Sequence, residues 1–167
     1  LGIRVYETRP DVVAVNDRIL AFAESGGTVI VQYNKYEYPQ GSFAPYTVSM
    51  GSGRGAPRVT DENSPFTILD RESPVLAFPN RIDEADFEGW VQERGLCFLA
   101  EWDERYTPLL EFNDPAEEPV RGSLLVAPVG RGIYAYAALA FFRQLPAGVP
   151  GAHRLFANLV SLTAEDW

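Results

Sequence analysis

Polar side chains stand where three expected strands end. Arg4 and Tyr6 close a first strand at 1–6, and Asn34 follows a second strand at 28–33. Arg143 and Gln144 follow a third strand that ends near residue 139. Open α/β sheets bind their ligands beyond the carboxyl ends of their parallel strands, which lie side by side. We therefore expect these side chains to meet at one edge of a sheet.

The loop at 34–58 adds aromatic rings to this predicted site. Arginine forks bind carboxylates and hydroxyls through paired hydrogen bonds, and aromatic rings stack on sugars and guanidinium groups. An anionic or sugar-like ligand is one interpretation. The alternative is that the two arginines pair with carboxylates such as those of Glu7, Glu37 or Asp103 and only fix the loops. The aromatic residues of the loop include Tyr36, Tyr38, Phe43 and Tyr46.

A second group of candidate ligand contacts lies at 88–95, where Trp90 and Arg94 stand among charged neighbours. Such mixtures of aromatic and charged residues are frequent in carbohydrate-contacting loops. The alternative for Trp90 is core packing with a satisfied indole N–H.

Catalytic constellations are missing from the sequence. Nucleophilic triads need a histidine base beside the nucleophile, and His153 is the only histidine. Cys97, the only cysteine, is expected as a buried thiol in a strand at 95–102. One histidine and one cysteine cannot supply the usual zinc ligands, although oxygen ligands for calcium exist at 61–63 or 83–86. We predict no catalytic residues, no metal site and no cofactor.

The composition describes an ordinary globular chain. It has 167 residues, 46% of them hydrophobic and 22% charged, and a net charge of -9. This acidic balance argues against nucleic acid as a partner. No apolar run reaches the length of a membrane span. The chain begins at Leu1 in what reads as a strand in progress, so we expect a piece of a longer chain, and the missing signal peptide leaves the compartment open.

Hydrophobic patterns predict alternating strands and helices. A strand at 1–6, a helix from 8–11 to Gly26, and a buried strand at 28–33 form a βαβ unit with a parallel crossover. Short apolar pieces lie at 59–69 and 75–78, strands are expected at 95–102 and 107–113, and a helical turn begins at Asp83. The chain ends in a hairpin at 122–142 and an amphipathic helix at 149–162.

Four motifs then resemble one family. Segments 2–6, 26–34, 86–95 and 143–151 are similar to the C-terminal domain of large bacterial PIG-L (LmbE-like) deacetylase proteins. That domain is itself similar to the class I glutamine amidotransferase and ThuA-like folds. The resemblance covers 1–162 and implies a single domain over 1–167. The implied fold is α/β: a flavodoxin-like three-layer sandwich with a mostly parallel sheet, a first strand and helix lying before Leu1, and the C-terminal hairpin and helix.

The resemblance implies an accessory role. The cysteine–histidine–glutamate set of amidotransferases has no counterpart here, and the deacetylase metal site belongs to a separate upstream domain. We therefore expect a non-catalytic module that supports its own upstream deacetylase domain, a hydrolase of N-acetylated sugars or glycoconjugates. A secreted or periplasmic parent protein fits this role. A carbohydrate ligand is expected at a surface made of Arg4, Tyr6, Asn34, Trp90, Arg94, Arg143 and Gln144.

Two other functions remain open from the sequence. The chain could be a hydrolase in its own right that uses Glu37, Asp61 or Glu101, since paired carboxylates perform acid–base catalysis when their pKa values differ. It could also be a structural interaction domain, which an exposed apolar patch at the place of the absent strand would indicate.

Overall fold

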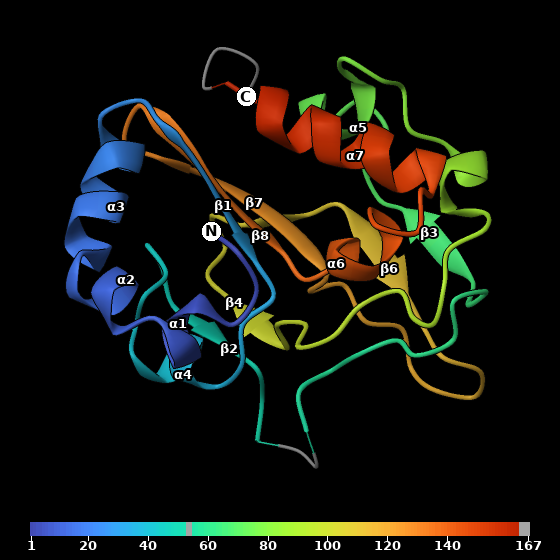
Figure 1. Ribbon diagram of the computed structural model, residues 1–167, viewed down its shortest axis with the longest axis horizontal. Helices are drawn as coiled ribbons and strands as arrows, with labels where there is room; N and C mark the ends of the chain where they lie inside the picture. The colour runs from blue at the N-terminus through green and yellow to red at the C-terminus, as the bar shows by residue number, and fades with distance from the viewer. Residues whose placement is uncertain (53–54, 164–167) are drawn as a thin grey trace.

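The central element is a mixed four-stranded sheet, seen in a computed structural model that describes residues 1–52 and 55–163 (Figure 1). Its strand order is β1-β8-β7-β5. Only β1 and β8 are parallel, whereas β8–β7 and β7–β5 are antiparallel. The four strands are β1 (Thr28–Gln32), β5 (Thr107–Pro108), β7 (Leu124–Val129) and β8 (Gly132–Ala137).

The β7–β8 hairpin forms the middle of the core. Val129 pairs with Gly132, so the connection is a two-residue turn, and Gly130 occupies its first position with a φ of 59°. A positive φ at this position suits glycine and the primed turns that match strand twist. Every residue of β8 is buried, and in β7 only Pro128 is exposed. The predicted hairpin is confirmed.

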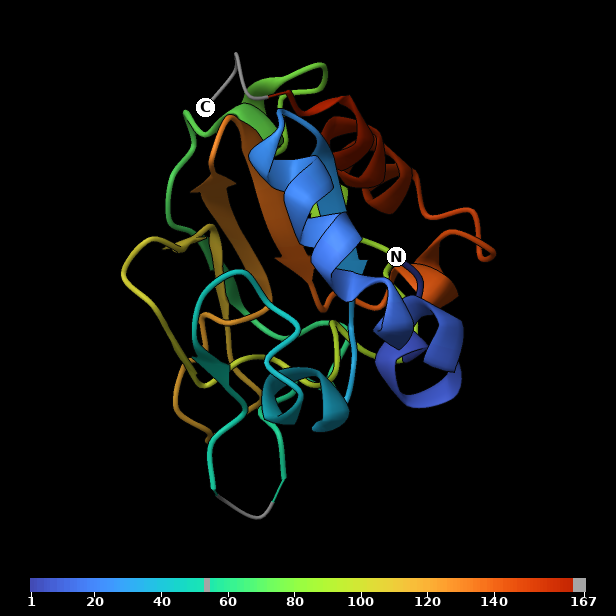
Figure 2. The ribbon, with the colours of Figure 1, turned by 90° about the vertical axis from the view of Figure 1, so that its left-hand side faces the viewer.

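Helices cover both faces of the sheet, with α3 (Asn16–Glu24) on one side and α7 (Pro150–Ser161) on the other (Figures 1 and 2). The predicted C-terminal helix is therefore confirmed. The remaining helices are short, and two small antiparallel sheets pair β2 with β4 and β3 with β6. These elements are α1 (Val5–Thr8), α2 (Pro10–Ala14), α4 (Glu37–Gln40), α5 (Pro74–Ala77), α6 (Phe141–Gln144), η1 (Glu84–Phe87), β2 (Val48–Ser49), β3 (Phe66–Ile68), β4 (Glu101–Trp102) and β6 (Leu110–Phe112).

The predicted flavodoxin-like sandwich with a mostly parallel sheet is wrong. A two-residue turn can join only antiparallel neighbours, so the hairpin fixes the orientation of β7 against β8. The parallel neighbour of β1 is β8, which comes much later in the sequence. The strand predicted at 95–102 is reduced to β4 and an isolated bridge at Gly95. The strand predicted at 107–113 is divided into β5, in the central sheet, and β6, in a small sheet.

The predicted βαβ unit is also wrong at its first strand. Leu1 pairs with β1, but Arg4 has a φ of 54° and turns the chain into α1. The single helix expected after it is divided at Val15 into α2 and α3. The apolar run at 75–78 is a helix, because Pro74 occupies the first helical turn, where its missing N–H costs nothing.

The predicted turn at Asp83 is confirmed as η1. The Asp83 carboxylate accepts from the Ala85 N–H, and the Asp86 carboxylate accepts from the Asp83 N–H. This reciprocal capping box satisfies backbone donors at the helix start.

Candidate functional site

The candidate site lies at the carboxyl ends of the only parallel pair in the central sheet. Gln32 of β1 is in register with Ala137 of β8, so the segments that follow both strands emerge side by side. The rings of Tyr33 and Phe142 connect them, with centroids 5.4 Å apart. Arg4 joins from α1, because its N–H donates to the Tyr33 carbonyl at 2.9 Å. The structure thus brings together the segments after β1 and β8, and Arg4 joins them from the start of α1 rather than from the end of a strand.

One half of the site is a charge cluster on Glu7. The Arg4 guanidinium donates to both Glu7 carboxylate oxygens, at 2.7 and 2.9 Å, and the Lys35 ammonium donates at 3.0 Å. Hydrogen bonds from Arg4 first and Lys35 second lower the pKa of Glu7 to about 2. The same pairing raises the pKa of Arg4. The pairing of Arg4 with Glu7, one of the alternatives open from the sequence, is present.

The other half is built on Arg143, at the end of β8 in α6. Its Nε donates to the Glu93 carboxylate, which is almost fully buried, and its guanidinium stacks 4.9 Å from the Phe142 ring. Gln144 is fully buried and closes the 91–93 loop. Its Nε2 donates to the carbonyls of Val91 and Glu93, and its Oε1 accepts from the Val91 N–H. Gln144 therefore fixes the loop that carries Glu93.

Tyr6 and Asn34 are buried beneath the Arg4 half. The Asn34 Oδ1 accepts from the Tyr6 N–H at 3.1 Å, and its Nδ2 donates to the Gln32 carbonyl at 2.9 Å. The Tyr6 hydroxyl donates to Asn16 at 2.7 Å, and its ring stacks on Phe43. The Asn34 side chain ties α1 to the end of β1, and the Tyr6 side chain ties α1 to Asn16 of α3 and to Phe43, so together they position Arg4.

Trp90 and Arg94 lie in the core, away from the exposed edge of the site. The Trp90 indole N–H donates to the Asp86 carbonyl at 2.9 Å, as the core-packing alternative required. Arg94 donates to the carbonyls of Phe87 and Ser64. Burial lowers its pKa to about 10. Its guanidinium lies 5.6–5.9 Å from four ring centroids, those of Phe66, Phe87, Trp90 and Phe112.

Cys97 is a neighbour of the site that the sequence did not place there. Its backbone is not in a strand, its φ is 56°, and its carbonyl accepts from the Tyr136 hydroxyl at 2.7 Å. Charges on Arg4 and Lys35 act on the thiol, but burial dominates and raises its pKa. A protonated thiol is a poor nucleophile, so the geometry does not support covalent catalysis. No local sequence pattern signals this position, because the contact joins distant segments.

The carboxylates of the alternative hydrolase occupy separate elements. Glu37 begins α4, Asp61 lies in the loop before β3, and Glu101 is in β4. The backbone N–H of Asp61 instead donates to the Asp114 carboxylate at 2.9 Å. Over residues 1–52 and 55–163, no three acidic, histidine or cysteine side chains gather closely enough to hold a metal ion.

The fold and site together define a mixed α/β domain with an ion-paired site at the ends of two parallel strands. No protein-family model matches the chain, and no significant match was found among curated proteins or solved structures. The resemblance to PIG-L-associated domains therefore stays a prediction. Within the described ranges, no helix combines the length and the apolar character that crossing a bilayer requires.

The Glu7 cluster gives a direct test of the site geometry. We expect Glu7 to stay ionised down to a pH near 2, so that its contribution to stability is present at neutral pH and is lost as the pH falls toward 2. Arg4→Ala should raise the pKa of Glu7 toward its ordinary value. Carboxyl-resolved NMR titration measures both. An unchanged Glu7 pKa in Arg4→Ala would contradict the cluster, and Arg81→Ala, which breaks an exposed pair with Glu72, is the control.

Proposed function

We propose that this domain is a non-catalytic module that binds carbohydrate at the strand-end site, defined as Arg4, Glu7, Lys35, Glu93 and Arg143 with the rings of Tyr33 and Phe142. The observation that supports it is the local balance of charge. Arg4 and Lys35 both pair with Glu7, and Arg143 pairs with Glu93. Glu37 supplies a third carboxylate, whose charge also acts on Arg4, although the chain as a whole carries a net charge of -9.

A balanced site favours a neutral, hydroxyl-rich ligand over an anion. The Arg4 and Arg143 forks are already engaged by carboxylates, so an added anion would have to displace Glu7 or Glu93. A hydroxyl can instead accept from a guanidinium N–H and donate to the neighbouring carboxylate without breaking either pair. Because ion pairs already hold the Arg4 and Arg143 side chains in place, these side chains lose little conformational entropy when a ligand binds.

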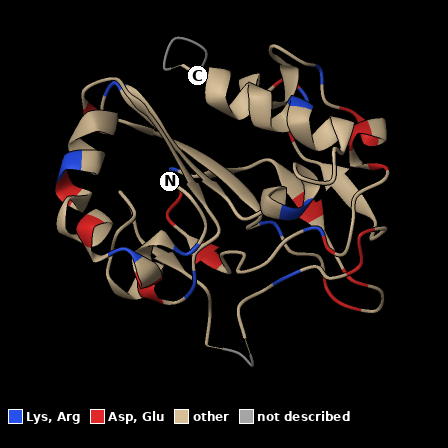
Figure 3. Ribbon diagram, in the orientation of Figure 1, with Lys and Arg blue, Asp and Glu red and all other residues tan. Residues whose placement is uncertain are grey.

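Aromatic surface is available beside these polar groups. Phe142 is partly exposed under the Arg143 guanidinium, and Tyr36, which follows Lys35, is 38% exposed. The strands of the central sheet carry no charged side chain, whereas the helices, the loops and the short strands β4 and β6 do (Figure 3). The site is therefore a polar surface supported by a rigid apolar core. An upstream PIG-L-type deacetylase domain is the proposed partner, and its support is the four sequence motifs.

The test is a titration of the protein with N-acetylglucosamine oligosaccharides. Binding is measured by calorimetry and by NMR of the Arg4, Lys35 and Arg143 side chains. We expect saturable binding that Arg4→Ala and Arg143→Ala each weaken about tenfold or more, since a charge-assisted hydrogen bond contributes about 1.5–3 kcal/mol. Arg81→Ala should bind as the wild type does. Thermal melts identify any variant that loses binding through unfolding, which matters for Arg143→Ala because it leaves Glu93 buried and unpaired.

Two outcomes would overturn the proposal. One is the absence of saturable binding to the wild-type protein across neutral and N-acetylated oligosaccharides. The other is equal weakening by Arg81→Ala and Arg4→Ala, which would mean that binding does not involve the strand-end site.

A further inference from the structure

Three adjoining hollows lie along the small β2–β4 sheet, below the central sheet in Figure 1. Their volumes are about 310, 200 and 260 Å³. Val48 lines the first and second hollows, and Trp102 lines the second and third. Because these two residues are directly opposite each other in the two strands, one cross-strand pair connects all three hollows. We call this region the Trp102 surface, and the residues that line it are not those of the strand-end site.

Trp102 has an unused hydrogen-bond donor. Its side chain is partly exposed between the second and third hollows, and its indole N–H has no acceptor among the described residues, 1–52 and 55–163. A buried indole N–H usually has a partner, as that of Trp90 has. A partly exposed tryptophan offers a flat apolar face together with one donor, and tryptophans of this kind often dominate the energy of binding at interfaces. Trp102 can therefore pack against an apolar group and bind a carbonyl at the same place.

A fixed wall borders the first hollow. The Arg105 guanidinium donates to the Asp103 carboxylate at 2.7 and 2.8 Å and lies 3.6 Å from the centroid of the Tyr46 ring. The Tyr46 hydroxyl donates to the Pro128 carbonyl at 2.7 Å, which holds the ring against β7. Side chains that are already held in place lose little conformational entropy when a ligand binds. This end of the Trp102 surface is therefore formed in the unbound protein.

The charge of the Trp102 surface is unbalanced at its centre. Arg105 is paired with Asp103, and Arg121, at the third hollow, is paired with Glu111. Glu101 lines the middle hollow, is exposed, and has no ion-pair partner in the part of the chain that the structure describes. A ligand with a positive charge at this place is therefore favoured, and the net charge of -9 attracts such a ligand over longer distances. A neutral oligosaccharide would leave Glu101 unmatched, and an anionic ligand would be repelled.

We propose that the Trp102 surface binds an extended segment of a partner protein that carries a lysine or an arginine. The basic side chain pairs with Glu101, an apolar side chain packs on the Trp102 ring, and a backbone carbonyl accepts from the indole N–H. An extended chain presents its side chains at regular intervals and can occupy three small hollows in a row, whereas a helix needs one wide groove. Grooves lined by aromatic side chains are a recurring means of binding extended segments.

Selection from a displayed library of random octapeptides tests this proposal. We expect enrichment of peptides that contain one basic residue near an apolar residue or a proline. A synthetic peptide of the enriched sequence should bind at least tenfold more weakly to Trp102→Ala and about threefold to fivefold more weakly to Glu101→Gln, since an exposed ion pair contributes less than a tryptophan anchor. Glu101→Lys should instead select peptides with an acidic residue at that place. The control is Glu88→Gln, which removes an exposed carboxylate outside the three hollows and should bind as the wild type does.

NMR of the tryptophan side chains locates the bound peptide. The signal of the Trp102 indole N–H should shift when it gains a carbonyl acceptor, while that of Trp90, already bonded to the Asp86 carbonyl, should not. Because Glu101 is exposed, its variants remain informative if Trp102→Ala unfolds. The proposal is overturned if no basic peptide is enriched, if Glu101→Lys selects the same peptides as the wild type, or if the Trp102 signal does not move. Displacement of the peptide by N-acetylglucosamine oligosaccharides would also overturn it, whereas a failure of carbohydrate binding at the strand-end site would not affect it.

Discussion

Raising the pH from 9 to 11 should reduce the free energy of unfolding by roughly 5–6 kcal/mol, enough to unfold a domain of ordinary stability. The cause is a set of buried tyrosines. Burial raises the pKa values of all five, to about 12 for Tyr6 and further for the others. These tyrosines, each 5% exposed or less, are Tyr6, Tyr38, Tyr106, Tyr134 and Tyr136. Burial also raises the pKa of Tyr33, which is 8% exposed and adds to the same trend.

The sign follows from the direction of these pKa shifts. A tyrosine whose pKa is raised in the folded state keeps its proton, while the unfolded chain releases it above about pH 10. Its stability contribution is complete below pH 10 and is lost as the pH rises toward the folded-state pKa. At pH 11 each buried tyrosine costs about 1.4 kcal/mol, so five cost about 7 kcal/mol. Arg94 opposes this by at most about 1.4 kcal/mol, because burial lowers its pKa to about 10 and the folded protein releases this proton above pH 10 while the unfolded chain keeps it.

Urea unfolding at pH 8 to 11, with tyrosinate absorbance recorded in parallel, measures both effects. The tyrosinate signal of the five buried residues should appear together with unfolding and not before it. A double variant, Tyr38→Phe and Tyr134→Phe, is the control. It removes two hydroxyls that bond each other at 2.9 Å, so it leaves no orphaned partner in that pair and should lessen the loss at pH 11 by about 3 kcal/mol. Stability that is flat to pH 11 would contradict the burial of this cluster.

Local signals in the sequence predicted the elements that depend on local chemistry. The glycine-containing turn at 130–132 marks the β7–β8 hairpin, the acidic start at Asp83 marks η1, and the apolar spacing after Pro150 marks α7. The meeting of the segments after β1 and β8, where Tyr33 lies beside Phe142, was also predictable, because both segments follow strand ends. This meeting needs only β1 and β8 to be parallel neighbours, and they are. Arg4 was predicted to end a strand of its own, whereas it precedes α1.

Strand neighbours and burial could not be predicted in this way. Hydrophobic runs do not tell which strands pair, so a sequence that alternates strand and helix patterns reads as a parallel sheet even where a hairpin supplies the centre. Burial of polar residues is equally hidden. In the sequence, Asn34, Arg94 and Gln144 resemble ligand contacts. In the structure, each side chain instead makes a hydrogen bond to a backbone group of a distant segment.

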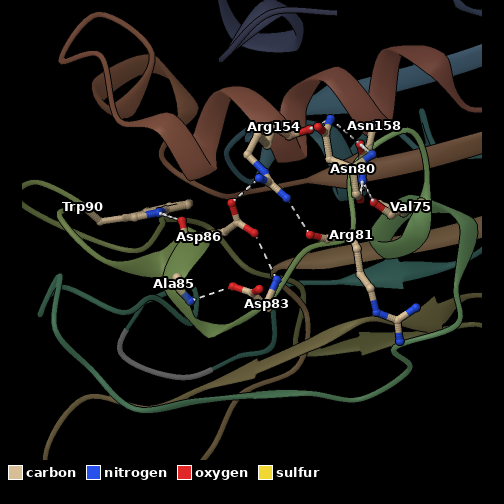
Figure 4. A network of polar contacts seen from close by, with 9 residues as sticks. All are labelled: Val75, Asn80, Arg81, Asp83, Ala85, Asp86, Trp90, Arg154 and Asn158. Atoms are coloured by element: carbon tan, nitrogen blue, oxygen red, sulfur yellow. Dashed lines mark hydrogen bonds and ion pairs between the residues drawn. The ribbon is translucent and has the colours of Figure 1, made fainter.

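Asn158→Ala should lower the free energy of unfolding by about 3–5 kcal/mol, although Asn158 is not part of the strand-end site. Asn158 is fully buried in α7 and makes four hydrogen bonds to α5 and the segment that follows it (Figure 4). Its Nδ2 donates to the carbonyls of Val75 and Asn80, at 2.8 and 2.7 Å. Its Oδ1 accepts from the backbone N–H and the side-chain Nδ2 of Asn80, at 2.9 and 3.0 Å.

The large effect follows from what alanine would leave behind. Two backbone carbonyls and one backbone N–H would lose their partners at a part-buried or buried place, and each such group costs about 1–3 kcal/mol. Arg154, one turn earlier in α7, holds the same segment from the exposed side. It donates to the Arg81 carbonyl at 2.7 Å and pairs with Asp86 at 3.0 Å. Arg154→Ala should cost less, since water can replace its exposed contacts.

Urea unfolding of Asn158→Ala, Arg154→Ala and Val160→Ala compares their free energies of unfolding. It distinguishes the loss of the buried Asn158 hydrogen bonds from a general destabilisation of α7. Val160 is 59% exposed on the same helix, so its truncation should change stability by less than about 0.5 kcal/mol. A loss below 1 kcal/mol in Asn158→Ala would contradict the hydrogen-bond network. Hydrogen exchange adds the location of the effect. Because Asn158 joins α7 to the segment at 75–80, faster exchange should appear first there, while the amides of β7 and β8 keep the protection of the central core.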